Sequence, residues 1–205
     1  MTMPPRGRPP SVSDDAVLDK ALAMFADAGY AAMSVRALNA ELGLSHEAVS
    51  QRFGPKSDLF GAAVRRGMDL FMCDFNEEIE RCAPADDLQR LHATVRAFMV
   101  AASRHPALGK LLHHNSIGDE ERVVLMRDTG LAESISETVA LLGRLYRAGL
   151  IRQTGIRELW FLAEGSVAPL HSPGLSQMFD PFDGPVEEKQ LIDRMSVAVM
   201  RSVIS

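Results

Sequence analysis

The sequence predicts an all-α protein. Almost every segment repeats its apolar residues at intervals of three and four, which places them on one face of a helix. The clearest series is Phe60, Val64, Met68, Phe71, Phe75 and Ile79. Glycine and proline separate the segments, and no stretch alternates apolar and polar residues as a half-buried strand does. Hydrophobic residues make up 46% and charged residues 24% of the 205 positions, as in ordinary globular domains.

Three short helices are expected at the start of the chain. Ser13 is placed to cap the first, which ends at Gly29, and the second extends from Ser34 to Gly43. The third begins at Ser45 and reads SHEAVSQRF. Its apolar residues lie four apart on one side, and hydrogen-bonding side chains occupy the other.

Longer helices, and one short helix at 107–114, are expected in the rest of the chain. They cover about residues 55–82, 88–102, 107–114, 120–148, 156–167 and 187–203. Pro84 and Pro106 end the first two, Gly130 and Gly143 are weak points within the fourth, and Gly149 ends it. The stretch PLHSPGLSQMFDPFDGPV is rich in proline and glycine and is predicted to be a loop.

The second and third short helices, separated by LGLS, have the composition of a helix-turn-helix. Gly43 supplies the tight turn, Leu44 fills the corner and Ser45 caps the following helix. The polar side of that helix is then free to enter a groove of DNA. A merely solvated helix face has the same composition, so this spacing alone leaves both interpretations open.

A longer pattern favours DNA binding. Residues 7–64 contain, in order, a basic arm, the helix motif LAMFADAGY, the motif SVRALNAELGLS, the aromatic residue Phe53 and the motif PKSDLF. This order and spacing resemble the N-terminal DNA-binding domain of TetR-family transcriptional regulators. The remainder resembles the family only in its helical pattern and in RAGLIR before the penultimate helix.

The resemblance implies a division into three parts. Residues 1–12 are expected to be a flexible basic arm, residues 13–59 the helix-turn-helix DNA-binding domain, and residues 60–205 a ligand-binding and dimerisation domain joined to it by a long helix. The implied protein is a homodimeric regulator, most often a repressor in this family. It would bind a palindromic operator in double-stranded DNA and be released by a small, mostly apolar molecule. No cofactor and no metal are expected.

The resemblance also assigns DNA contacts. Early positions of the third helix and one position of the second reach base edges, while hydroxyls and cations around them hold phosphates. The residues expected to contact DNA are Arg6, Arg8, Ser34, Arg36, Ser45, His46, Glu47, Ala48, Ser50, Gln51, Arg52 and Lys56. Two of them depart from the family pattern. Ser50 stands where a phosphate-binding tyrosine is usual, and Glu47 where a small residue or proline is usual.

The arm carries its two cations in the motif RGRPP. An extended, narrow and cationic segment of this kind fits the minor groove of A·T-rich DNA, where negative potential is concentrated. A disordered tail is the alternative, and disorder in the free protein with minor-groove contact in the complex satisfies both.

The candidate effector cavity is predicted from the same resemblance. Methionine and aromatic side chains suit a flat or flexible apolar ligand, although the same stripe is more often ordinary core. The residues expected to line the cavity are Met68, Phe71, Met72, Phe98, Met99, His113, Met126, Tyr146 and Trp160. The small residues of FLAEGSVAPL would let another helix approach closely, either in a dimer interface or within one chain.

The metal-binding and redox residues of the chain form no recognisable motif. His113 and His114 are adjacent on a helix and point about 100° apart, so they do not share one ion easily. His105 lies across a proline. A polar anchor for a ligand or an exposed pair are the alternatives. Cys73 and Cys82 are nine apart and fit neither a zinc knuckle nor a CxxC motif, so reduced thiols are expected.

Charge and composition restrict the remaining classes. The net charge of −5 indicates that any nucleic acid is bound by a few placed cations rather than by bulk charge. No apolar run is long enough to cross a bilayer and the first residues lack the apolar centre of a signal peptide, so no membrane contact and a cytoplasmic location are expected. An all-α enzyme is the main alternative, but the sequence has no G-x-S-x-G, nucleotide loop or ligand-spaced histidines. A regulator acting through protein partners is a third.

Overall fold

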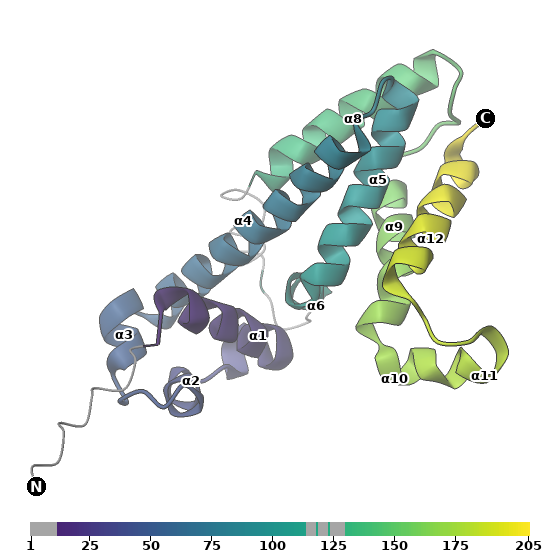
Figure 1. Ribbon diagram of the computed structural model, residues 1–205. Helices are drawn as coiled ribbons and strands as arrows, with labels where there is room; N and C mark the ends of the chain where they lie inside the picture. The colour runs from purple at the N-terminus through teal and green to yellow at the C-terminus, as the bar shows by residue number, and fades with distance from the viewer. Residues whose placement is uncertain (1–11, 114–117, 119–122, 124–129) are drawn as a thin grey trace, which may run out of the picture.

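The computed structural model describes residues 12–113, 118, 123 and 130–205. Over these residues the protein is a bundle of helices without a strand, apart from one isolated bridge between Ile151 and Ile204 (Figure 1). The predicted all-α class is therefore confirmed. The elements are α1 (Asp14–Ala32), α2 (Val35–Glu41), α3 (Ala48–Phe53), α4 (Lys56–Cys82), α5 (Asp87–Arg104), α6 (Pro106–His113), α8 (Leu131–Arg147), α9 (Ile156–His171), α10 (Pro173–Ser176), η1 (Gln177–Phe179), α11 (Asp180–Asp183) and α12 (Glu188–Val203).

The first two helices begin where their caps predict. The hydroxyl oxygens of Ser13 and Ser34 accept the backbone N–H groups of Ala16 and Ala37, at 3.2 and 3.3 Å. Each bond satisfies a donor that the first helical turn leaves free. Gly29 interrupts α1 with a φ of 78°, and the helix resumes to Ala32 rather than ending at the glycine.

The third helix begins later than predicted. The expected cap, Ser45, lies in the turn, and α3 starts at Ala48 without a bond from the side chain of its own N-cap residue. Asn39 on α2 replaces that cap, because its amide oxygen accepts the N–H of Val49 at 3.1 Å. His46 and Glu47 consequently lie in the turn before α3 rather than in its first turn.

Asn39 is a fully buried polar residue that connects α2, the turn and α3. Its amide nitrogen donates to the carbonyls of Val35 at 3.1 Å and His46 at 3.0 Å, while its oxygen accepts from Val49. The amide is thus satisfied on both sides inside the core, as burial of a polar group requires. The relative placement of α2 and α3 depends on this side chain together with the core contacts of Leu38 and Val49.

The hydrophobic core begins in α1–α3 and continues into the bundle. Phe25, Leu38, Val49 and Leu59 are buried in one cluster that extends through α4 to α5 and α6. Packing therefore has no break at residue 59, where the sequence predicts a domain boundary.

One glycine allows the three helices α1, α4 and α6 to come close. A Cβ added at Gly67 on α4 would lie 2.5 Å from Leu22 on α1 and 3.3 Å from Leu108 on α6. Both distances are tighter than ordinary contact between side chains. The short helix α6 therefore touches the helix-turn-helix unit directly through α1.

The far half of the molecule is organised around α5. Figure 1 shows α4 running from the α1–α3 unit to the opposite end of the bundle, with α5 beside it and α9 and α12 next to each other on the other side of α5. A second buried cluster joins α5, α8, α9 and α12. No described helix has an apolar window of the length that a bilayer crossing requires.

Two expectations about this half were wrong. Gly130 adopts a left-handed conformation with a φ of 70° directly before α8, so it is a helix boundary rather than a weak point; most of the preceding residues lie outside the described part. The segment after Pro169 was expected to be a loop but contains α10, η1 and α11. Pro173 and Pro181 occupy first-turn positions, where proline favours a helix start.

Ion pairs fasten the end of α4 to α5 and α12. The buried Glu78 accepts from Arg96 at 2.7 Å and from Arg81 at 2.8 Å, and Arg96 also bonds Asp193. Burial raises the pKa of the Glu78 carboxyl, but the hydrogen bonds from Arg81 and Arg96 outweigh it. The folded-state pKa therefore lies below the ordinary value of 4.5.

The first prediction concerns Asn39. Asn39→Ala should lower the free energy of unfolding by about 2–3 kcal/mol, because it leaves the buried Val49 N–H without its acceptor and removes the partly buried bond to the His46 carbonyl. Gln51→Ala, which removes an exposed hydrogen bond to Glu47, should change it by less than about 0.5 kcal/mol. Urea unfolding followed by circular dichroism measures both, and equal losses in the two variants would contradict the assigned role of Asn39.

The second prediction concerns Glu78. A lowered folded-state pKa stabilises the protein fully above 4.5, and this contribution disappears as the pH falls through the folded-state value. Glu78→Gln should therefore cost about 2–3 kcal/mol at neutral pH and progressively less in acid. Urea unfolding at neutral pH and below pH 4.5 tests this. If Glu78→Gln lowered the free energy of unfolding equally at both pH values, the packing of the side chain rather than its charge would explain the loss.

Candidate DNA-binding face and effector cavity

The polar side of α3 and its preceding turn faces solvent. His46, Glu47, Ser50, Gln51 and Arg52 are exposed. Val49, four residues before Phe53, is fully buried and anchors the helix from the other side. The expected separation into an apolar anchor and a free polar face is therefore present in the structure.

Neighbouring elements add to this face. Ser34, Arg36 and Ser45 are exposed, and Ala48 is half-buried beside them. Arg36 on α2 makes no ion pair within the described residues, so its guanidinium is available. Arg6 and Arg8 lie outside the residues that the structure describes.

The two other expected cations are held by contacts within the protein. Arg52 pairs with Asp14 at the start of α1. The amino group of Lys56 donates to the carbonyl of Ala31 at 3.0 Å and lies 5.0 Å from the centre of the Tyr30 ring. Both cations remain at the edge of the exposed face, but the sequence contained no sign of these partners.

The polar residues of the face also interact with one another. The side-chain nitrogen of Gln51 donates to the Glu47 carboxylate at 3.3 Å. This bond holds the carboxylate, which departs from the family pattern, along the helix. Ser50 projects only a hydroxyl at the position where the family usually has tyrosine.

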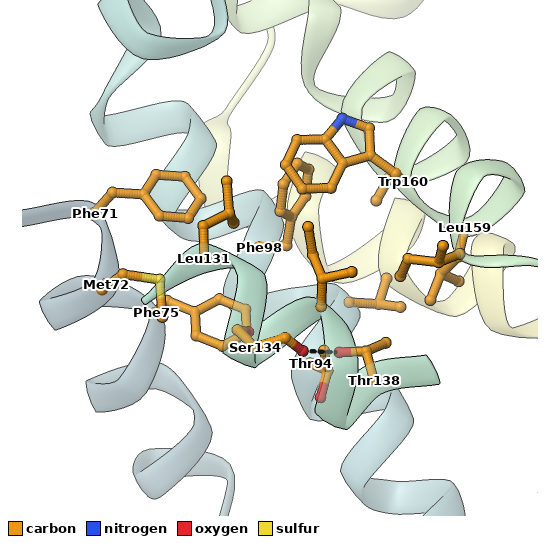
Figure 2. Close-up of a pocket in the computed structure, with 14 residues that line it drawn as sticks. Phe71, Met72, Phe75, Thr94, Phe98, Leu131, Ser134, Thr138, Leu159 and Trp160 are labelled. Carbon is orange, nitrogen blue, oxygen red and sulfur yellow. Dashed lines mark hydrogen bonds between the residues drawn. The ribbon is translucent and has the colours of Figure 1, made fainter. Parts of the chain in front are cut away.

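A cavity of about 50 Å³ lies between α4, α5, α8 and α9 (Figure 2). Figure 2 shows Trp160 at one end and Thr94, Ser134 and Thr138 gathered at the other. It is lined by Phe71, Met72, Phe75, Thr94, Val95, Phe98, Leu131, Ser134, Ile135, Thr138, Ile156, Leu159, Trp160 and Ala163.

The hydroxyls of this cavity offer acceptors. The Thr94 hydroxyl donates to the carbonyl of Arg90 and the Thr138 hydroxyl to that of Ser134, each at 2.8 Å. Their protons are therefore used within their own helices, and their oxygen lone pairs remain for a ligand. The remaining wall is aliphatic and aromatic.

A second cavity of about 40 Å³ lies between α4, α5, α6 and α9. It shares part of its wall with the first, namely Phe71, Phe98, Leu131 and Trp160. Its other lining residues are Met68, Ala102, His105, Leu108, Gly109, Leu112, Glu164 and His171. We name the first cavity the α8 compartment and the second the α6 compartment.

Five of the nine sequence-predicted residues line these compartments: Met68, Phe71, Met72, Phe98 and Trp160. The hydroxyl residues and the α8 wall were missed. Leu131, Ser134 and Thr138 lie at helical spacing on one face of α8, which was the signal available in the sequence.

Three predicted lining residues lie elsewhere, and a fourth, Met126, falls outside the described residues. Met99 is buried in the core beside α9 and α12, because consecutive helical residues point about 100° apart and Phe98 takes the cavity side. Tyr146 is 51% exposed on the outer side of α8. His113 is exposed and bonded to Glu164, the acid that lines the α6 compartment.

A protein-family model described as "Bacterial regulatory proteins, tetR family" matches residues 17–63. This segment contains most of α1, all of α2 and α3, and the beginning of α4. A comparison with curated protein sequences finds no match.

Solved structures resemble nearly the whole chain. The TetR family transcriptional regulator PfmR from Thermus thermophilus is 21% identical with a TM-score of 0.59, covering 90% of this chain and 97% of PfmR. AibR in complex with isovaleryl coenzyme A and operator DNA is 21% identical with a TM-score of 0.61, covering 88% and 94%. A TetR-family member from Streptomyces coelicolor A3 is 22% identical with a TM-score of 0.61, covering 95% and 92%.

At these identities the structures establish a common fold, while the family model identifies the N-terminal unit. Residues 17–63 thus match the family model of TetR-type regulatory proteins, in a chain whose overall fold is shared with solved TetR-family transcriptional regulators.

Proposed function

We propose that the protein is a ligand-responsive transcriptional repressor that binds a palindromic operator as a homodimer in the cytoplasm. The observation that carries the proposal is the exposed polar face of α3 within a domain of the TetR type. Residues 13–59 serve as the DNA-binding unit, residues 1–12 as a basic arm, and residues 60–205 as the effector-binding and dimerisation unit.

On the operator, α3 enters the major groove. His46 and Glu47 from the preceding turn, Ala48 at the start of the helix and Arg36 from α2 reach base edges. Ser34, Ser45, Ser50, Arg52 and Lys56 hold phosphates around them. To bind phosphates, Arg52 must leave Asp14 or contact both groups, and Lys56 must do the same with the carbonyl of Ala31.

The proposed dimer forms through α9 and α12. Phe161 and Leu162 on α9 and Val197 on α12 are exposed apolar side chains. Gly165 and Ala168 on α9 are small, so another helix can approach closely there. Large exposed apolar residues on adjoining helices are typical of an interaction surface. A two-fold dimer would present two α3 helices to the half-sites of a palindrome.

The effector occupies the compartments beside α4–α6, α8 and α9. AibR has been solved with isovaleryl coenzyme A and operator DNA, and by analogy we propose that this chain also combines a small effector with DNA binding. The α6 compartment is adjacent to α1, because Leu108 lines it and also packs near Leu22 at Gly67. In this proposal α6 has two positions, one compatible with DNA binding and one not. An effector that binds the second conformation more tightly shifts the population toward release from DNA, by no more than the difference in its affinity for the two conformations.

The third prediction concerns DNA affinity. Arg52→Ala and Lys56→Ala should each weaken binding to every DNA sequence and reduce the salt dependence of log affinity by about one for each phosphate that is no longer neutralised. Gel shifts on the DNA flanking the protein's own gene, at several salt concentrations, measure this. Arg147→Ala, an exposed cation at the end of α8, is the control and should leave binding unchanged. Absence of a tightly bound palindrome would contradict the operator proposal.

The fourth prediction concerns the dimer. Phe161, which is 57% exposed on α9, should be covered by the partner, so Phe161→Asp should shift the protein from dimer to monomer. Tyr146→Asp changes an aromatic residue of similar exposure on α8 and should leave the dimer intact. Sedimentation velocity distinguishes the two outcomes. A monomeric unsubstituted protein, or a dimer in both variants, would argue against this interface.

A further inference from the structure

The two compartments are neighbours with shared walls and different polar groups. They meet at Phe71, Phe98 and Trp160, which contribute to the walls of both. The α8 compartment is apolar except for its hydroxyls. The α6 compartment ends in the polar groups of His105, Glu164 and His171.

The described walls carry a negative charge and no permanent positive charge. Among the described residues that line the two compartments there is no lysine or arginine, and the one carboxylate among them is Glu164, whose side chain is 20% exposed. His105 is engaged by Asp74 at 2.7 Å, and His171 by the carbonyl of Ala102 at 3.0 Å. An anionic ligand group would find no lysine or arginine among these described lining residues, and burial of an unpaired charge carries a large cost in free energy.

The shared aromatic rings surround the space beside Glu164. The ring centres of Phe98 and Trp160 are 4.7 Å apart and those of Phe71 and Phe98 are 6.0 Å apart, both pairs inclined rather than stacked. His105 continues this wall, 6.2 Å from Phe71. Aromatic faces carry negative potential, and several of them around one space attract an ammonium group.

We propose that the α6 compartment binds the cationic nitrogen of an organic amine, with the Glu164 carboxylate as its counter-ion and Phe71, Phe98 and Trp160 as its aromatic walls. The apolar body of the same molecule fills the α8 compartment. The inference rests on the proposed effector role of the cavity and specifies the chemical class of the effector.

The bond between Glu164 and α6 explains how a bound amine could affect that helix. Glu164 is bonded to His113, the last residue of α6, and Lys110 on the same helix pairs with Asp27 on α1. An ammonium group that takes the Glu164 carboxylate competes with His113 for it. The contact between α9 and the end of α6 is then weakened while the ligand is bound.

The test uses three probes with the same six-carbon chain: hexylamine, hexanol and hexanoate at neutral pH. Trp160 is the only tryptophan of the chain and lines both compartments, so its fluorescence reports binding directly. Hexylammonium should bind at least about tenfold more tightly than hexanol, and hexanoate more weakly than either.

Two variants and a control assign the preference to Glu164. Glu164→Gln should bring hexylammonium affinity down to that of hexanol, while unchanged hexanol binding shows that the cavity is intact. His113→Ala removes the competing partner and should raise hexylammonium affinity. Glu158→Gln alters an acid on the same helix outside the two compartments and should change nothing.

The proposal is overturned by equal affinities for amine and alcohol, by tightest binding of hexanoate, by a preference for amine that survives in Glu164→Gln, or by no response to any probe. Binding of hexanol without preference for the amine would still leave an apolar effector cavity. Gel shifts without any small molecule test the DNA-binding proposal separately.

Discussion

The arrangement of the DNA-binding face depends on one buried amide. Asn39 is completely enclosed, yet both ends of its side chain are hydrogen-bonded, to α2, to the turn and to α3. A helix of six residues is too short to be stable by itself. Its position therefore comes from Val49 in the core and from Asn39 at its start, and the exposed polar residues follow from that placement.

The continuous core has consequences for coupling between the two ends of the molecule. Buried residues of α1–α3 belong to the same cluster as those of α4, α5 and α6, and the missing side chain of Gly67 leaves room for Leu22 of α1 and Leu108 of α6. Close-packed interiors transmit strain, because no free volume absorbs it. A ligand that moves α6 must therefore displace α1 or separate the two helices.

The cavity and the DNA-binding face use charge in opposite ways. Cations lie around α3, where Arg52 is bonded to Asp14 and Lys56 to the carbonyl of Ala31. The cavity walls carry a carboxylate and aromatic rings instead. The proposed sites for nucleic-acid phosphate and for an effector amine thus lie at separate places, in a chain of net charge −5.

The sequence by itself determined the helices, most of their ends and the order of the helix-turn-helix elements. These features depend on neighbours a few residues away: the serine caps, the apolar spacing, and glycines such as Gly43 with positive φ. Tertiary structure decided the rest, because the partners are distant in the chain. Asn39 rather than Ser45 caps α3, Arg52 is paired with Asp14, and Met99 turns toward α12 while Leu131 and Thr138 face the cavity. Each outcome depends on which helix lies opposite, and apolar periodicity identifies a buried face without identifying its neighbour.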